Sequence, residues 1–221
     1  MQQLIKKCVA TSLTLSISLF TFTLLAHTKG EAHSTHNTMR TPVVLESYPN
    51  KPADFQKDIR PFVDAIISKY GIEEWNTVVL TNELHRHLGI YSILGAKMGI
   101  RARELLGAGL DDLHVKSLIG SQPPMSCLND GLQVSTGASL GRGTIEVASK
   151  PTDPAVIFSY HNQKLRIDLK SSVTNRIKKD IIRTKTKYGN LTPEYFQEIR
   201  RLAIRYWLDF DRKKIFTEKL L

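Results

Sequence analysis

The sequence predicts an α+β fold in which one sheet, antiparallel or mixed, is flanked by helices. Three observations support this. Helical periodicity dominates residues 54–71, 81–107 and the last fifty residues, strand-like alternation is confined to residues 112–170, and no internal repeat is visible. Strands clustered between helical segments are typical of α+β proteins, whose helices cover one face of the sheet. The chain has 221 residues, a length that fits one packed domain.

The first 32 residues are expected to form a signal peptide or an N-terminal anchor. Lys6 and Lys7 precede the uncharged run CVATSLTLSISLFTFTLLA, which is the pattern of a secretory signal. The run is also long enough for a membrane span, because about 20 apolar residues suffice. We therefore expect an exported protein, periplasmic or extracellular, or one that an uncleaved N-terminal segment anchors to the membrane.

Residues 33–54 predict a flexible linker, because they are polar, rich in Thr, Asn and Pro, and without periodicity. His27, His33 and His36 have a spacing that could hold a metal, but histidines in a polar run are usually solvated. Removal of the leader would remove Cys8 and leave Cys127 without a disulfide partner. A lone cysteine is either a buried small hydrophobe or a metal ligand or reactive thiolate.

Two helices are predicted in the first half of the chain. Residues 54–71 form the first, with Pro61 in its first turn and Gly71 at its end. Residues 81–107 carry the strongest helical pattern, and Gly107 can terminate it. Three glycines inside this second helix each cost about 1 kcal/mol relative to alanine, so we expect another backbone or a ligand to approach closely; they are Gly89, Gly95 and Gly99.

The second half of the chain predicts strands and then helices. Residues 112–120 alternate between apolar and polar residues, as a strand does. Residues 127–137 predict a short helix that begins after Pro123 and Pro124 and ends at Gly137. The strand-like runs TIEVAS, AVIFSYH and QKLRIDLK follow, with a hairpin turn at His161 and Asn162. Two helices end the chain, SVTNRIKKDIIRTKTKYG and TPEYFQEIRRLAIRYWLDF, the second with Thr192 as N-cap.

The net charge of +10 is concentrated in one segment. Residues 164–187 carry nine Lys or Arg side chains against Asp168 and Asp180. Such a segment can face anionic lipid, although a solvated helix surface is the simpler interpretation. Aromatic residues are not interleaved with the charges, as base stacking requires, so we expect no nucleic-acid partner.

Histidine, cysteine and aspartate form the candidate centre. In a regular helix the side chains of His85 and His87 diverge by about 200°, so only one can face a given ion. We prefer His87, which borders the face of Tyr91, and place His85 on the polar flank. Cys127 and Asp130 share one face of a helical turn. Imidazole, thiolate and carboxylate suit zinc and leave a fourth position open.

These residues lie in two motifs that resemble those of the FmdE family, which is named after formylmethanofuran dehydrogenase. The first is HLGIYSILGAKMG and the second PPMSCLNDGLQVSTGASLGRGTIEV. The resemblance spans about residues 77–170 and implies an α+β domain over 55–221 with C-terminal helices at 171–215. It also implies a homodimer with a cleft where the motif Cys and His gather around a divalent metal, often zinc.

With the resemblance, the expected metal ligands are His87, Cys127 and Asp130, and the expected catalytic residues are Cys127 and Asp130. Gln133, Thr136 and Gly137 would bind a cofactor or orient the ligands; Asp130 could instead shape the turn beside Gly131, and Gln133 and Thr136 could satisfy buried backbone groups. The chain departs from many members in having Gly89 where they have a second cysteine, and it has no C-terminal zinc ribbon.

The sequence thus predicts an exported metal-binding domain that acts on, or holds, a small molecule. Whether it is an enzyme stays open. The alternatives are a non-enzymatic module for a small metallated cofactor such as a tetrapyrrole, and a protein of the membrane surface. The family name implies no reaction here, because a chain with two cysteines at most cannot hold the iron–sulfur clusters of a dehydrogenase.

Overall fold

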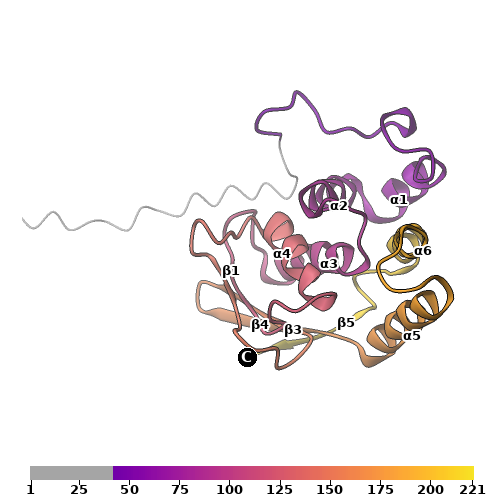
Figure 1. The fold of residues 1–221 in the computed structure, drawn as a ribbon. Coiled ribbons are helices and arrows are strands. Elements are labelled where there is room, and N and C mark those ends of the chain that lie inside the picture. Colours follow the sequence, from indigo (N-terminus) through magenta and orange to yellow (C-terminus); the bar gives the residue numbers. More distant parts are fainter. Residues whose placement is uncertain (1–41) are drawn as a thin grey trace, which may run out of the picture. The chain divides into compact units, whose positions relative to one another are not determined.

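The structure is a computed structural model and describes residues 42–221. The predicted signal peptide or anchor and residues 33–41 of the predicted linker lie outside these residues. Within them the chain forms a five-stranded mixed sheet, six α-helices and three short 3-10 helices (Figure 1). The predicted α+β class is confirmed.

The sheet has the strand order β2-β1-β3-β4-β5. The outer pair β1 and β2 is parallel, and all other neighbours are antiparallel. Its strands are β1 (His114–Ser117), β2 (Ile145–Val147), β3 (Ala155–Tyr160), β4 (Gln163–Leu169) and β5 (Phe216–Leu220). The predicted hairpin turn at His161 and Asn162 joins β3 to β4. Strand β5 is absent from the sequence prediction, because its run FTEKL has only one buried residue.

The helices lie mainly on one side of this sheet, with α3 at the centre (Figure 1). They are α1 (Val63–Tyr70), α2 (Ile72–His85), α3 (Ile90–Leu106), α4 (Leu128–Thr136), α5 (Ser171–Tyr188) and α6 (Pro193–Asp209). Helix α3 is buried over most of its surface, and its side chains Ile93, Leu94 and Met98 are completely or nearly completely buried. The predicted N-cap of α6 is confirmed, since Thr192 Oγ1 accepts a hydrogen bond from the Tyr195 amide. None of the described helices is long and apolar enough to span a bilayer.

The prediction of one continuous helix over 81–107 is wrong, because residues 86–89 interrupt it and separate α2 from α3. Arg86 adopts a left-handed φ of 67° after α2, and Gly89 is the extended N-cap of α3. Asn82 holds the break: its Oδ1 accepts hydrogen bonds from the Gly89 amide at 3.0 Å and from Ser92 Oγ at 2.9 Å. The helical periodicity continues in both halves, which is why the pattern alone does not reveal the interruption.

The expected close approach at the glycines is confirmed for α3 and α4. A Cβ atom added to Gly95 would lie 2.0 Å from the Leu128 carbonyl oxygen, and one added to Gly131 would lie 2.2 Å from the Ser92 carbonyl oxygen. The two helices therefore meet backbone to backbone. This contact fixes the start of α4, and with it Cys127 and Asp130, against the break between α2 and α3.

A buried charge network joins α2, α3 and the segment before β5. The side chains of Lys97 and Glu74 are both fully buried, and Lys97 Nζ lies 2.5 Å from Glu74 Oε1. Arg212 donates to the other carboxylate oxygen of Glu74 at 2.9 Å. The Lys97 ammonium also lies 3.8 Å from the centre of the Tyr70 ring. The network ties the C-terminal strand segment to the helical layer.

Candidate functional site

A small cavity lies where the break between α2 and α3 meets the start of α4. Its volume is about 170 Å³, and helices α5 and α6 close it from the other side. Three side chains that could ligate a metal line it, and they are His85, His87 and Cys127. The remaining lining is apolar or aromatic and includes Ile90, Tyr91, Ile181, Leu191, Tyr195 and Phe196.

His85 is the most constrained polar group of this cavity. Its Nδ1 lies 2.6 Å from Asp130 Oδ2, and its side chain is only 10% exposed. Its Nε2 is buried and has no hydrogen-bond partner among residues 42–221. In the neutral tautomer whose Nδ1 proton is donated to the carboxylate, Nε2 carries the free lone pair. Gly89 makes room for this edge of the ring, since a Cβ atom there would lie 3.1 Å from Nε2.

The structure reverses the roles expected of the two histidines. His85 is not on a polar flank, and His87 is the exposed one of the pair. The 200° argument fails because residues 86–89 are not helical, and the two rings lie with their centres 4.2 Å apart. Although His87 is exposed in part, desolvation of the rest of its ring, together with the neighbouring His85, lowers its pKa below the ordinary value. His87 is therefore a neutral imidazole near pH 7.

Cys127 is partly exposed and faces the same cavity. Burial, and then the negative charge of Asp130, raises the pKa of its thiol. In the absence of a bound cation this group is a thiol rather than a thiolate near pH 7. Burial and the neighbouring Cys127 raise the pKa of Tyr91 to about 12, so its hydroxyl stays protonated.

Of the three residues expected to bind a cofactor or orient ligands, Thr136 and Gly137 have partners at the end of α4. Thr136 Oγ1 donates to the Leu132 carbonyl at 2.6 Å and accepts from the Ala138 amide at 3.2 Å. Gly137 ends α4 in the left-handed region with a φ of 75°. The Gln133 carbonyl accepts the Gly137 amide at 2.9 Å. None of the three lines the Cys127 cavity, which favours the second interpretation, that they complete the end of α4.

The expected ligand set of His87, Cys127 and Asp130 is not formed as such. Among residues 42–221 no group of three or more His, Cys, Asp or Glu side chains is arranged to hold a metal ion. Asp130 pairs with His85 and does not line the cavity. The donor types nevertheless suit zinc, since an unpartnered imidazole nitrogen and a sulfur line one cavity. Two candidate donors thus line one cavity, and His87 lines it as well.

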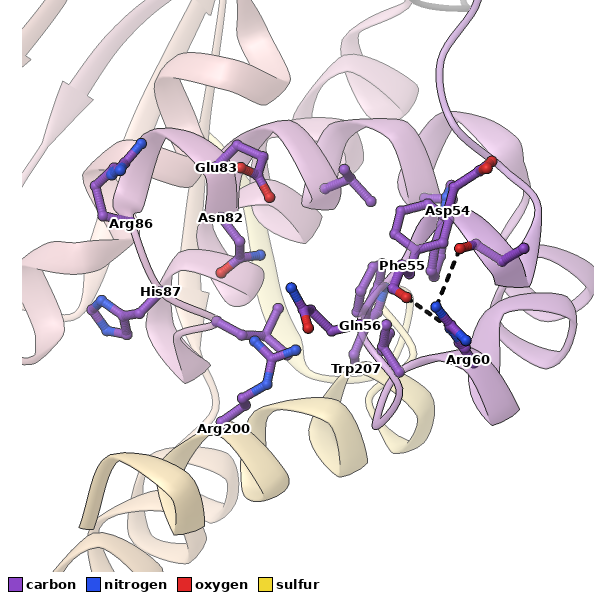
Figure 2. A pocket seen from close by; sticks show the side chains of 15 residues that line it. Asp54, Phe55, Gln56, Arg60, Asn82, Glu83, Arg86, His87, Arg200 and Trp207 are labelled. Carbon is purple, nitrogen blue, oxygen red and sulfur yellow. Dashed lines mark hydrogen bonds between the residues drawn. The ribbon is translucent and has the colours of Figure 1, made fainter. Parts of the chain in front are cut away.

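A second and larger cavity of about 550 Å³ adjoins the first (Figure 2). Its walls come from residues 53–60, from α2, from the break at 86–88 and from α6. His87 lines both cavities. Sequence reasoning missed this cavity because its walls come from three separate stretches of the chain, and no local pattern signals that they converge.

The comparison with known families agrees with the geometry. Residues 84–217, more than half of the chain, match the sequence profile described as FmdE, Molybdenum formylmethanofuran dehydrogenase operon. The chain belongs to the FmdE family. The FmdE match contains His85, His87, Cys127 and Asp130, and it extends through α5 and α6, beyond the motifs that revealed it. It begins at Leu84, so residues 53–60 and most of α2 lie outside the FmdE segment. No curated protein sequence matches the chain.

Proposed function

We propose that this FmdE protein binds a divalent metal ion of the zinc class in the Cys127 cavity. His85 Nε2 and Cys127 Sγ would be the first two ligands, and His87 the third. The observation that carries the proposal is the buried, unpartnered Nε2 of His85, whose other ring nitrogen is held by Asp130. A buried polar atom without a partner is rare in a folded protein, and a cation is one way to satisfy it.

Each neighbour of the centre has a role in this proposal. Asp130 acts through His85: it fixes the ring orientation and raises the basicity of Nε2, as carboxylates behind ligating histidines do. His87 is neutral near pH 7 because burial lowers its pKa, so its lone pair is free. The thiol of Cys127 must lose its proton to ligate, so binding would release a proton and tighten as the pH rises.

The surroundings suggest what such a centre could act on. A bound metal would polarise a carbonyl oxygen or acidify a water molecule. The chain itself supplies a cavity lined mostly by apolar and aromatic side chains, and His87 beside it, a neutral imidazole able to accept a proton. The volume of about 170 Å³ is below the roughly 300 Å³ at which pockets for larger ligands begin. A small reacting group is favoured, and a tetrapyrrole would need further surface from a second copy in a homodimer.

Metal titration of the full chain tests the proposal. The triple variant His27→Ala, His33→Ala, His36→Ala is the starting protein, because those histidines could bind zinc independently. We expect one zinc per chain by calorimetry and elemental analysis. His85→Ala and Cys127→Ala should each abolish it, and Asp130→Asn should weaken it about 10- to 100-fold. His161→Ala, at an exposed turn, is the matched control. Undiminished zinc in His85→Ala would refute the assignment.

A second candidate function, contact with an anionic membrane, is favoured by helix α5. Its exposed surface carries four lysines that have no ion pair among the described residues, namely Lys178, Lys179, Lys185 and Lys187. Ile182 lies among them with 53% of its surface exposed. Each basic residue near an anionic bilayer contributes about 1 kcal/mol. Export, or anchoring through the N-terminal segment, would bring the domain close to such a surface.

Vesicle flotation tests this second candidate. Binding to vesicles of phosphatidylcholine with phosphatidylglycerol, but not to phosphatidylcholine alone, is expected, and it should weaken at high salt. The double variant Lys178→Glu, Lys185→Glu should abolish it. Lys150→Glu, Lys219→Glu changes the net charge equally at exposed sites outside α5 and serves as the control. Equal loss in both variants would show a general charge effect and contradict the assignment to α5.

A further inference from the structure

The larger cavity has the size and the lining of a small-molecule site. Its volume of about 550 Å³ lies within the range of about 300–1,000 Å³ found for ligand pockets. One end is apolar: Phe55 and Val79 are partly exposed there. Phe55 packs edge-on at 4.9 Å against Trp75, which is buried and stacked at 4.8 Å on the buried Trp207. The other end is polar and reaches His87.

Two opposite charges face the cavity from different walls. Figure 2 shows Glu83 of α2 and Arg200 of α6 directed into it from opposite sides, with Gln56 between them. Among residues 42–221, Glu83 has neither an ion pair nor a side-chain hydrogen bond. Arg200 donates from Nε and Nη2 to Asp58 at 2.5 and 2.8 Å, and its Nη1 has no hydrogen-bond partner within residues 42–221. Glu83 and Arg200 form no ion pair with each other.

We propose that this cavity binds a zwitterionic small molecule of the amino-acid type, with an apolar side chain. Glu83 receives the ammonium group, Arg200 Nη1 donates to the carboxylate, and the side chain rests against Phe55 and Val79, behind which Trp75 and Trp207 are buried. Opposite charges on facing walls that do not pair with each other can both be satisfied by a ligand that carries both charges. Asp58 already balances most of the charge of Arg200, so Glu83 is expected to contribute more to affinity than Arg200.

This inference rests on the proposed function, because it supplies the substrate class of the same centre. His87 lines both cavities, so a ligand held in the larger one has its polar end next to the Cys127 cavity. The wall formed by residues 53–60 lies outside the segment that matches the FmdE family. The ligand preference is therefore a property of this chain rather than of the family domain.

Calorimetry on the metal-free full chain, in the presence of EDTA, tests the inference with L-phenylalanine as the probe. Phenethylamine lacks the carboxylate and 3-phenylpropionate lacks the ammonium group, so they are the matched probes. We expect phenylalanine to bind at least tenfold more tightly than either. Glu83→Gln should weaken phenylalanine about tenfold and leave 3-phenylpropionate unchanged, because only the ammonium contact is lost. Glu194→Gln, an exposed carboxylate outside the cavity lining, should change nothing.

The outcomes separate this inference from the metal proposal. No binding of phenylalanine, equal binding of the three probes, or full affinity in Glu83→Gln would overturn the amino-acid site. Zinc stoichiometry is measured on the same preparations without EDTA, and Glu83→Gln should retain it. Loss of zinc binding with intact phenylalanine binding would refute the metal centre alone, and intact zinc without phenylalanine binding would refute only the site described here.

Discussion

The contact between α3 and α4 makes a sharp prediction for Gly131→Ala. An added methyl group would lie 2.2 Å from the Ser92 carbonyl oxygen and 2.3 Å from the Ala96 amide nitrogen. Both are backbone atoms, so no side-chain rotation can relieve the clash. The helices must separate, or the variant must unfold. Because Asp130 precedes Gly131 directly, any separation also moves its carboxylate away from His85.

The magnitude follows from two opposing effects. Overpacking of a filled core costs about 1–3 kcal/mol and sometimes more, and the backbone contacts place this site at the upper end. Replacing a helical glycine by alanine returns up to about 1 kcal/mol. We therefore expect a net loss of about 2 kcal/mol, which for a domain of this size lowers the melting temperature by about 4–8 °C.

Urea and thermal unfolding followed by circular dichroism measure this loss. Gly141→Ala is the matched control, because a Cβ atom there would meet nothing within 4 Å. It should be neutral. A Gly131→Ala protein as stable as the unchanged chain would refute the backbone contact, and with it the position of α4 on which the candidate site depends.

Two further predictions concern the buried charges and the thiol. In urea unfolding, Glu74→Gln should destabilise the protein more than Lys97→Met. In Glu74→Gln the buried Lys97 loses the carboxylate with which it pairs, whereas in Lys97→Met the carboxylate of Glu74 still pairs with Arg212. Single losses of this kind cost about 3–5 kcal/mol, and the reverse order would contradict the network. Alkylation of Cys127 by iodoacetamide, followed by mass spectrometry of its peptide, should have a pH midpoint above the ordinary value of about 8.5, because burial and Asp130 raise the pKa of the thiol. Asp130→Asn should move the midpoint down, and a midpoint at or below about 8.5 in the unchanged chain would argue against the buried thiol.

Most of the fold could be predicted from local patterns. The ends of α4 and α6 carry their own signals in Gly137 and Thr192, and the hairpin of β3 and β4 is set by a two-residue turn. The glycines of α3 predicted a close backbone neighbour without identifying it. Strand β5 and the break before α3 could not be predicted, because pairing with β4 and the bonds of Asn82 are tertiary interactions.

The sequence identified the residues of the candidate centre, but it did not predict correctly how the two histidines are placed. The spacing of Cys127 and Asp130 was sufficient to place both at the start of α4. The choice between His85 and His87 depended on helical continuity, and a single left-handed residue, Arg86, invalidated it. Periodicity describes a run of residues, whereas the direction of one side chain next to an interruption depends on what packs against it.

The same two features of the helical layer shape both the fold and the candidate centre. A left-handed residue inside a helical pattern and glycines inside helices are locally unfavourable, so tertiary contacts must offset them. Those contacts are the bonds of Asn82 to Gly89 and Ser92, and the backbone packing of Gly95 and Gly131. Together they bring Asp130 within 2.6 Å of His85 and leave one imidazole nitrogen unpartnered. Gly95 and Gly131 therefore serve the packing of the two helices, whereas His85 and Asp130 are positioned by that packing. Only residues of the second kind need to touch a ligand.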